Sequence, residues 1–151
     1  MHNVNSGRGE RFFINFSIIH RSTVKFLISR LKEESIEDAI PPIIMLTYKN
    51  PGVTQDYIAK TLRIDKGAIA KGIQKQIKAG YIDRAPSQSD KRAYNLSLTS
   101  EGEAIIPKLQ KIEKELKGIF TSALSPDEVL ELDRLLKKIS TNIDERGVNK
   151  K

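Results

Sequence analysis

The sequence contains no cysteine and no tryptophan, and it has only two histidines. The absence of cysteine excludes disulfides, thiol-based redox sensing and cysteine-ligated metals. Two histidines without cysteine also argue against a tetrahedral zinc site. We therefore expect neither a metal nor another cofactor.

Recognisable catalytic motifs are also missing. The chain has no glycine-rich phosphate-binding loop and no HExxH motif. His2 lies near the start, and His20 lies in an apolar segment, where we interpret it as a packed or partly exposed side chain rather than a base. Carboxylates occur mainly at expected helix starts or in surface pairs such as Glu113 with Lys117. A small enzyme is therefore the least favoured function class.

Long apolar runs are absent as well. No segment approaches the length of a membrane span, and the first residues lack the apolar core of a signal peptide. We expect a cytoplasmic protein without a membrane partner. The 151 residues, 38% of them hydrophobic, suffice for one domain with a real core.

Positive charge is what the chain has in excess, with a net charge of +7. Residues 52–100 contain nine Lys or Arg against four Asp or Glu, so a net of +5 lies in this third of the chain. A basic region of this kind fits a polyanionic partner such as nucleic acid.

A helix is predicted within this basic region. Asp65 is a suitable N-cap, and Gly80 is placed to end the helix in the left-handed conformation. Ile69, Ile73 and Ile77 recur every four residues and form one apolar stripe. The side chains largely off that stripe are polar or basic, namely Lys66, Lys71, Gln74, Lys75 and Lys78.

Short elements flank this helix on both sides. A helix from Gln55 to Leu62, with Thr54 as its cap, joins it through the three-residue turn 63–65, which is a helix-turn-helix arrangement. Strands at 81–84 and 94–98 follow, with a polar loop between them. A lysine-rich helix face alone is commonly just solvated. The basic hairpin directly after it favours DNA binding, because cations neutralise phosphates and a helix fits the major groove.

Residues 54–65, 80–84 and 90–102 resemble the MarR (multiple antibiotic resistance regulator) family. The pattern D-x-R followed by L-x-L-T-x-x-G is its most specific mark, and the resemblance extends from about Arg11 to about Asn142. It implies a mainly α chain with a small β-hairpin wing, in which a winged helix-turn-helix is flanked by long N- and C-terminal dimerisation helices. It also implies a dimeric, DNA-binding transcription regulator.

One position departs from this family pattern. Four residues before the helix-ending glycine the family usually has leucine, whereas this chain has Gln76. Together with the isoleucine stripe, this difference suggests a slightly rotated packing face.

We therefore predict a homodimeric repressor that binds a pseudo-palindromic operator in double-stranded DNA. Gln74 is suited to reading an adenine edge, and Arg92 at the wing tip is expected to enter the minor groove with Asp90 orienting it. The alternative for Asp90 and Arg92 is a loop ion pair of little energetic value. The predicted DNA-binding residues are Thr54, Gln55, Lys66, Gly67, Ala70, Lys71, Gln74, Lys75, Arg84, Asp90, Lys91 and Arg92.

Amphipathic segments precede and follow this central region. A helix at 10–32 has an apolar surface wider than one stripe, which fits either a partner chain on its second side or a central core helix of a monomer. A long helix is predicted at 100–120, with Ser100 and Glu103 at capping-box spacing and Pro107 bending it. Ser125 is expected to cap a last helix.

The predicted organisation has five parts. They are a mobile N-terminus (1–9), a dimerisation helix (10–35), the winged helix-turn-helix DNA-binding domain (40–100), C-terminal dimerisation helices (101–145) and a basic tail (146–151).

Two further questions stay open at the level of sequence. The family resemblance implies release from DNA by a small anionic or phenolic ligand, and an aromatic acid is expected to lie near Arg11, His20, Arg21 and Lys25. The alternative to DNA binding is a winged-helix protein–protein adaptor, whose basic face would be incidental.

Overall fold

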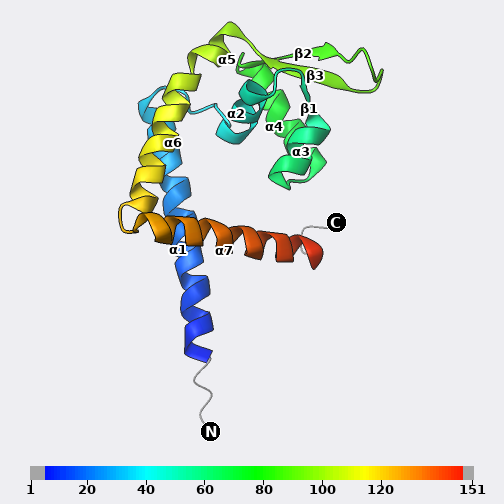
Figure 1. Cartoon of the computed structure of the whole chain (residues 1–151). Helices are drawn as coiled ribbons and strands as arrows, with labels where there is room; N and C mark the ends of the chain where they lie inside the picture. The colour runs from blue at the N-terminus through cyan, green and yellow to red at the C-terminus, as the bar shows by residue number, and fades with distance from the viewer. Residues whose placement is uncertain (1–5, 148–151) are drawn as a thin grey trace. The chain divides into compact units, whose positions relative to one another are not determined.

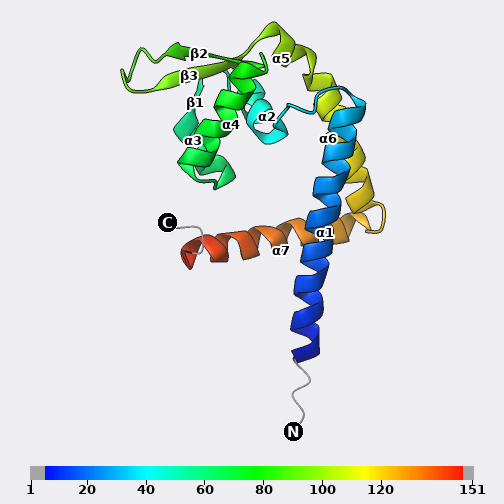
Figure 2. The same cartoon turned by 180° about the vertical axis from the view of Figure 1, so that it is seen from behind.

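The computed structural model describes residues 6–147, and the chain divides after Glu37 into two compact units (Figures 1 and 2). The first unit contains one long helix, and the second contains all the other elements. Their bounds are α1 Ser6–Glu33, α2 Pro41–Lys49, β1 Val53–Thr54, α3 Gln55–Leu62, α4 Lys66–Lys78, β2 Ile82–Pro86, β3 Tyr94–Leu98, α5 Ser100–Ala104, α6 Ile106–Thr121 and α7 Pro126–Glu145.

The first helix begins earlier than predicted. Residues 6–9, which were predicted to precede the helix, belong to α1, so the predicted helix start at Glu10 is corrected to Ser6. Residues 1–5 of the predicted N-terminal segment and residues 148–151 of the predicted basic tail lie outside the described part of the chain.

The helix-turn-helix consists of α3 and α4, and its helix boundaries are set by local hydrogen bonds. Thr54 Oγ1 accepts from the backbone N–H of Tyr57 at 3.3 Å, and Asp65 Oδ1 accepts from that of Ala68 at 3.1 Å. Both predicted N-caps are thus confirmed, and they satisfy amides that have no partner within the helix. Gly80 has φ +84°, as predicted for the residue that ends α4.

The sheet has three antiparallel strands in the order β1-β3-β2. Sequence reasoning missed β1, in which Val53 pairs with Leu96 and Thr54 with Asn95. This pairing attaches the start of α3 directly to the wing hairpin. Figures 1 and 2 both show β2 and β3 as a long hairpin with α2, α3 and α4 gathered on one side.

The core of the second unit lies between this sheet and the three helices. It is almost entirely aliphatic, which gives dense packing without buried polar atoms that need partners. Its buried members are Ile43, Val53, Ile58, Ala59, Ile69, Ile73, Ile82 and Leu96.

Gln76 is the polar exception on the buried face of α4. Its side chain is fully buried, where its Oε1 accepts from the backbone N–H of Ile40 and its Nε2 donates to the carbonyl of Asp38, both at 2.9 Å. The packing face is therefore not rotated away from this position, and that interpretation was wrong. Gln76 instead links α4 to the backbone segment before α2.

The second half of the L-x-L-T-x-x-G pattern forms the junction between β3 and α5. Thr99, not Ser100, is the N-cap, because its Oγ1 accepts from the N–H of Gly102 at 3.0 Å. Thr99 also donates from its backbone N–H to the carbonyl of Tyr81 at 3.1 Å. A Cβ on Gly102 would lie 2.1 Å from this same carbonyl oxygen, so only glycine permits the close approach.

The long helix predicted at 100–120 is two helices in the structure. It breaks at Ile105 between α5 and α6, and Pro107 occupies the first turn of α6. Proline has no N–H and its ring clashes with the carbonyl four residues earlier. Pro107 therefore restarts the helix, and the prediction of a single bent helix was wrong.

The last helix, α7, begins with the predicted capping box. Ser125 N–H donates to Glu128 Oε2 at 2.8 Å, and Glu128 N–H donates to Ser125 Oγ at 3.3 Å. Near its other end, Asp144 Oδ2 lies 2.8 Å from Arg63 Nε in the turn between α3 and α4. Buried residues are absent from α7, which leaves exposed the apolar side chains of Leu130, Leu132, Leu135, Leu136, Ile139 and Ile143.

The first unit also has a large apolar surface. Many apolar side chains of α1 are exposed, which agrees with the broad apolar pattern of its sequence. They are Phe12, Phe13, Ile14, Phe16, Ile18, Ile19, Val24 and Ile28.

Residues 6–147 contain neither a helix suited to span a membrane nor a cluster of metal-ligating side chains. None of the described helices is long and apolar enough to cross a membrane. Nor does this part of the chain gather three or more His, Asp or Glu side chains that could hold a metal ion.

Candidate nucleic-acid interface

A concave surface of about 390 Å³ lies between the helix-turn-helix and the wing. Its walls come from the start of α3, from the outer part of α4 and from both strands of the hairpin. Seven of the predicted DNA-binding residues line it together, although they are up to 38 positions apart in the chain: Thr54, Gln55, Ala70, Gln74, Arg84, Asp90 and Arg92.

The other predicted residues lie outside this concavity but are exposed. Gly67, Lys71 and Lys75 recur every four residues and so share one face of α4, beside the face that carries Ala70 and Gln74. Lys91 lies in the exposed wing loop. These remaining members extend a basic surface along α4 and at the wing tip.

Lys66 is engaged by a carboxylate of the same unit. Its Nζ lies 3.1 Å from Asp56 Oδ1 in the first turn of α3, and both side chains are largely exposed. An exposed ion pair of this kind contributes little to stability. The contact between Asp56 and Lys66 joins α3 to α4, and both charges remain exposed to solvent.

Asp90 organises the wing loop through its backbone. Its Oδ1 accepts from the backbone N–H of Arg92 at 2.9 Å, rather than from the guanidinium. Ser87 closes the other side, because its N–H donates to the carbonyl of Ala93 at 3.0 Å. These bonds shape the turn that presents Arg92, whose side chain is exposed.

Sequence reasoning missed some residues of this surface, above all Tyr94. The guanidinium carbon of Arg84 lies 4.8 Å from the centroid of the Tyr94 ring. Strand alternation was the available signal, since residues 94 and 96 face the same side of β3. Asp56, Ser87, Ser89 and Asn95 also line the concavity and were not predicted.

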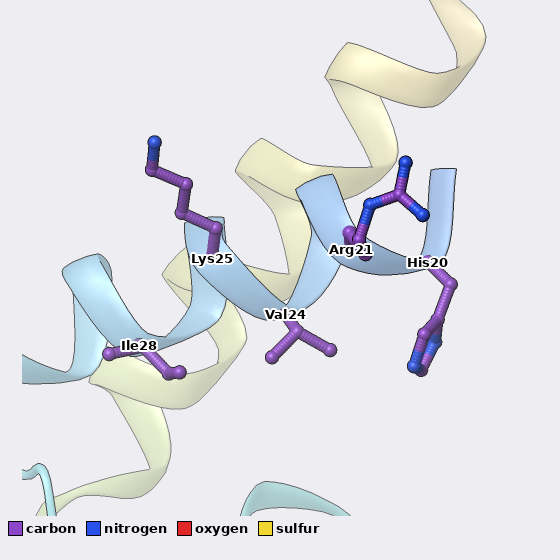
Figure 3. Close-up of a pocket in the computed structure, with 5 residues that line it drawn as sticks. All are labelled: His20, Arg21, Val24, Lys25 and Ile28. Atoms are coloured by element: carbon purple, nitrogen blue, oxygen red, sulfur yellow. The ribbon is translucent and has the colours of Figure 1, made fainter. Parts of the chain in front are cut away.

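Three of the four predicted ligand-binding residues line a depression of about 310 Å³ on α1 (Figure 3). His20, Arg21 and Lys25 lie there with the apolar Val24 and Ile28. Figure 3 shows Arg21 and Lys25 extending from the helix in one direction and Val24 and Ile28 in another, so the lining has a charged part and an apolar part. Arg21 donates to Ser17 Oγ one turn earlier.

Arg11 is not part of the lining of this depression. It lies nine residues before His20 in the same helix, which corresponds to about 13 Å along the helix axis.

Comparison with known proteins gives consistent results. A sequence model described as the MarR family matches residues 41–93. The HTH-type transcriptional regulator BilQ of Clostridium symbiosum is 30% identical, over 86% of this chain and 91% of the relative.

Solved structures agree in fold. A MarR transcriptional regulator from Methanosarcina mazei has a TM-score of 0.74 and 26% identity, over 88% of this chain and 96% of the other. A mutant MarR from E. coli, solved in complex with operator DNA, has a TM-score of 0.78 and 23% identity, over 91% of this chain and 99% of the other. At that identity the second similarity concerns the fold alone.

Proposed function

Because this chain belongs to the MarR family of transcription regulators, which are not enzymes, we propose that it is a homodimeric repressor that binds a pseudo-palindromic operator in double-stranded DNA. The observation that carries the proposal is the concavity in which residues of α3, α4 and the wing converge. A helix in the major groove and a wing in the adjacent minor groove would leave a sugar–phosphate strand between them, and the concavity between α4 and the wing could accept such a strand. The E. coli protein of the same fold was solved with operator DNA.

Within this interface α4 reads the major groove. Gln74 lines the concavity and makes two hydrogen bonds to an adenine edge, while Gly67 and Ala70 permit close approach. Lys71 and Lys75 on the adjacent face bind phosphate or guanine. Lys66 exchanges Asp56 for a phosphate when DNA binds.

The wing and the start of α3 supply backbone contacts. Arg92 enters the minor groove from a loop that Asp90 shapes, and Lys91 binds a phosphate nearby. Thr54 and Gln55 lie at the N-terminal end of α3, where backbone amides favour an anion.

The exposed apolar faces of α1 and α7 support a homodimer. Exposed apolar surface of this extent commonly marks a site of interaction with another protein chain. We assign residues 10–35 and 101–145 to dimerisation and residues 40–100 to DNA binding. A two-fold symmetric dimer requires two half-sites about one helical turn apart.

Selection from a random duplex pool at two salt concentrations tests the DNA-binding proposal. A recovered palindrome with half-sites about one turn apart supports it. Recovery of nothing but salt-sensitive background contradicts it and favours the protein–protein adaptor, which pull-down of a partner would then test.

Two variants sharpen this test. Arg92→Ala is expected to weaken binding to all sequences and to lower the salt slope by about 1 for each protomer. Gln74→Ala is expected to change the preference at a particular base pair. Lys114→Ala, an exposed lysine of α6, is the matched control and should change neither.

We also propose that a small aromatic acid releases the protein from DNA by binding at the depression on α1. Arg21 and Lys25 supply cations, and Val24 and Ile28 supply apolar surface. Release requires that the acid bind the two conformations unequally. Salicylate titrated to millimolar concentration into the DNA complex should lower affinity, whereas salicyl alcohol, which lacks the carboxylate, should not. Unchanged affinity with salicylate would count against this ligand class.

A further inference from the structure

The ring of Tyr94 is a half-exposed aromatic surface on the polar wall of the DNA-binding concavity. The Arg84 guanidinium carbon lies 4.8 Å from its centroid. This distance is within the roughly 6 Å over which a cation is attracted to a ring face. The two residues come from different strands, so the contact spans the wing.

The strand register explains why they meet. Arg84 pairs with Leu96, and Pro86 pairs with Tyr94. Because side chains alternate along a strand, Arg84, Leu96 and Tyr94 all point to one face of the sheet. Leu96 is buried and forms the floor of the concavity, while Arg84 and Tyr94 lie on its wall.

Building on the DNA binding proposed above, we propose that Tyr94 is a positioning residue that holds the Arg84 guanidinium toward a backbone phosphate of the bound DNA. A guanidinium is flat, so it stacks on a ring with one face while the N–H groups at its edge stay directed outward. These N–H groups match the geometry of a phosphate, to which arginine donates two hydrogen bonds. Lysine has no such flat face.

The gain from this arrangement is pre-organisation. A long side chain loses rotamer freedom when it binds a phosphate, and a side chain already held in place loses less. Tyr94 thus strengthens DNA binding through Arg84 without itself touching the DNA.

A double-mutant cycle with Tyr94→Leu and Arg84→Ala tests this role. The dissociation constant is measured on the duplex selected from the random pool. Tyr94→Leu should weaken binding about two- to fivefold when Arg84 is present and should have no effect in the Arg84→Ala background. Tyr94→Phe, which keeps the ring, should bind like the wild-type protein.

The salt dependence separates positioning from a direct contact. Arg84→Ala should lower the salt slope by about 1 for each protomer, because one phosphate contact is lost. Tyr94→Leu should leave the slope unchanged, since the guanidinium still reaches the phosphate.

The possible outcomes are distinct. An equal loss from Tyr94→Leu in both backgrounds, no loss at all, or a Tyr94→Phe variant as weak as Tyr94→Leu would overturn the role of Tyr94 and leave the DNA-binding function intact. A wild-type protein that binds no duplex would overturn both proposals.

Discussion

Helices α4 and α7 are both amphipathic, but they differ in what covers their apolar side. Ile69 and Ile73 of α4 are at most 4% exposed, because α2, α3 and the sheet pack against them. In α7, Leu136 is 43% exposed and no residue is buried. Both helices have capped starts, so local hydrogen bonding does not explain the difference.

The difference shows that the apolar face of α4 is covered by its own chain, whereas that of α7 is left largely exposed. The core around α4 closes within one chain, so the exposed side of α4 belongs to a domain whose apolar core is already buried. Burying a leucine side chain completely contributes roughly 1.5–3 kcal/mol. The leucine and isoleucine side chains of α7 have gained only part of this, because they remain 37–71% exposed. We infer that a second copy of the chain completes α7.

The largest expected effect is a loss of folding stability from a substitution at Gly102. Gly102→Ala would place a Cβ 2.1 Å from the carbonyl oxygen of Tyr81, a backbone atom that already accepts from Thr99. Neither side can move cheaply, so we expect a loss of about 3 kcal/mol or more in the free energy of unfolding. Urea unfolding followed by circular dichroism measures it.

Gly118→Ala in α6 is the control for this change. A Cβ there meets nothing within 4 Å, and alanine is favoured over glycine in a helix by up to about 1 kcal/mol. A Gly102→Ala protein that unfolds at the same urea concentration as the wild type would show that the junction is not closely packed.

The next largest effect is expected on the proposed homodimer, in which a second copy of the chain covers the apolar face of α7. Leu136→Asp places a charge in the apolar stripe, and burying it without a partner is costly. We expect the dissociation constant of the homodimer to rise about a hundredfold or more, which corresponds to about 2.7 kcal/mol. Sedimentation equilibrium measures this constant.

Thr141→Asp introduces the same charge on the opposite side of α7 and should leave the dimer intact. Equal masses for the Leu136→Asp and wild-type proteins would show that this face is not the interface. A monomeric wild-type protein would contradict the homodimer itself.

A smaller effect is expected at Gln76, the polar residue on the buried face of α4. Gln76→Leu removes the hydrogen bonds with Ile40 and Asp38 and leaves their partly buried backbone groups without that partner. We expect a loss of about 1–3 kcal/mol, even though leucine is more apolar. The midpoint of urea unfolding measures it.

Gln74→Leu is the matched control for this test, because Gln74 is exposed on the same helix and its change should stay within about 0.5 kcal/mol. If Gln76→Leu is as stable as the wild type, the buried bonds contribute nothing net.

The smallest effect is expected from the exposed ion pair between Glu131 and Arg134 on α7. Glu131 accepts two hydrogen bonds from Arg134, each at 2.7 Å, and this bonding lowers the pKa of the Glu131 carboxyl. Desolvation opposes the change, and the positive charge of Arg134 adds to it. The same contact raises the pKa of Arg134. A lowered folded-state pKa adds stability above the unfolded-state pKa, and this stability is lost as the pH falls through the folded-state value.

Melting temperatures of the wild type and Glu131→Gln should therefore differ slightly at neutral pH and converge in acid. The difference is small because solvent screens this exposed pair. A difference that persists at low pH would assign the effect to something other than this ion pair.

Much of the local structure was predictable because it depends on neighbouring residues. The caps Thr54, Asp65 and Ser125 bond to amides three positions away, so a short segment contains both partners. Gly80 ends α4 for the same local reason. The two-residue strand β1 was missed because its pairing partners lie more than 40 residues later in the chain.

The sequence by itself determined the helix caps, the apolar stripes and the family pattern, because each depends on residue type and short spacing. Only the tertiary structure decided that Gln76 is buried against the segment before α2 and that the carbonyl of Tyr81 lies against Thr99 and Gly102. It also decided which residues share the concavity with Arg84. These contacts join residues far apart in the chain, and their geometry follows from how the helices and the sheet pack.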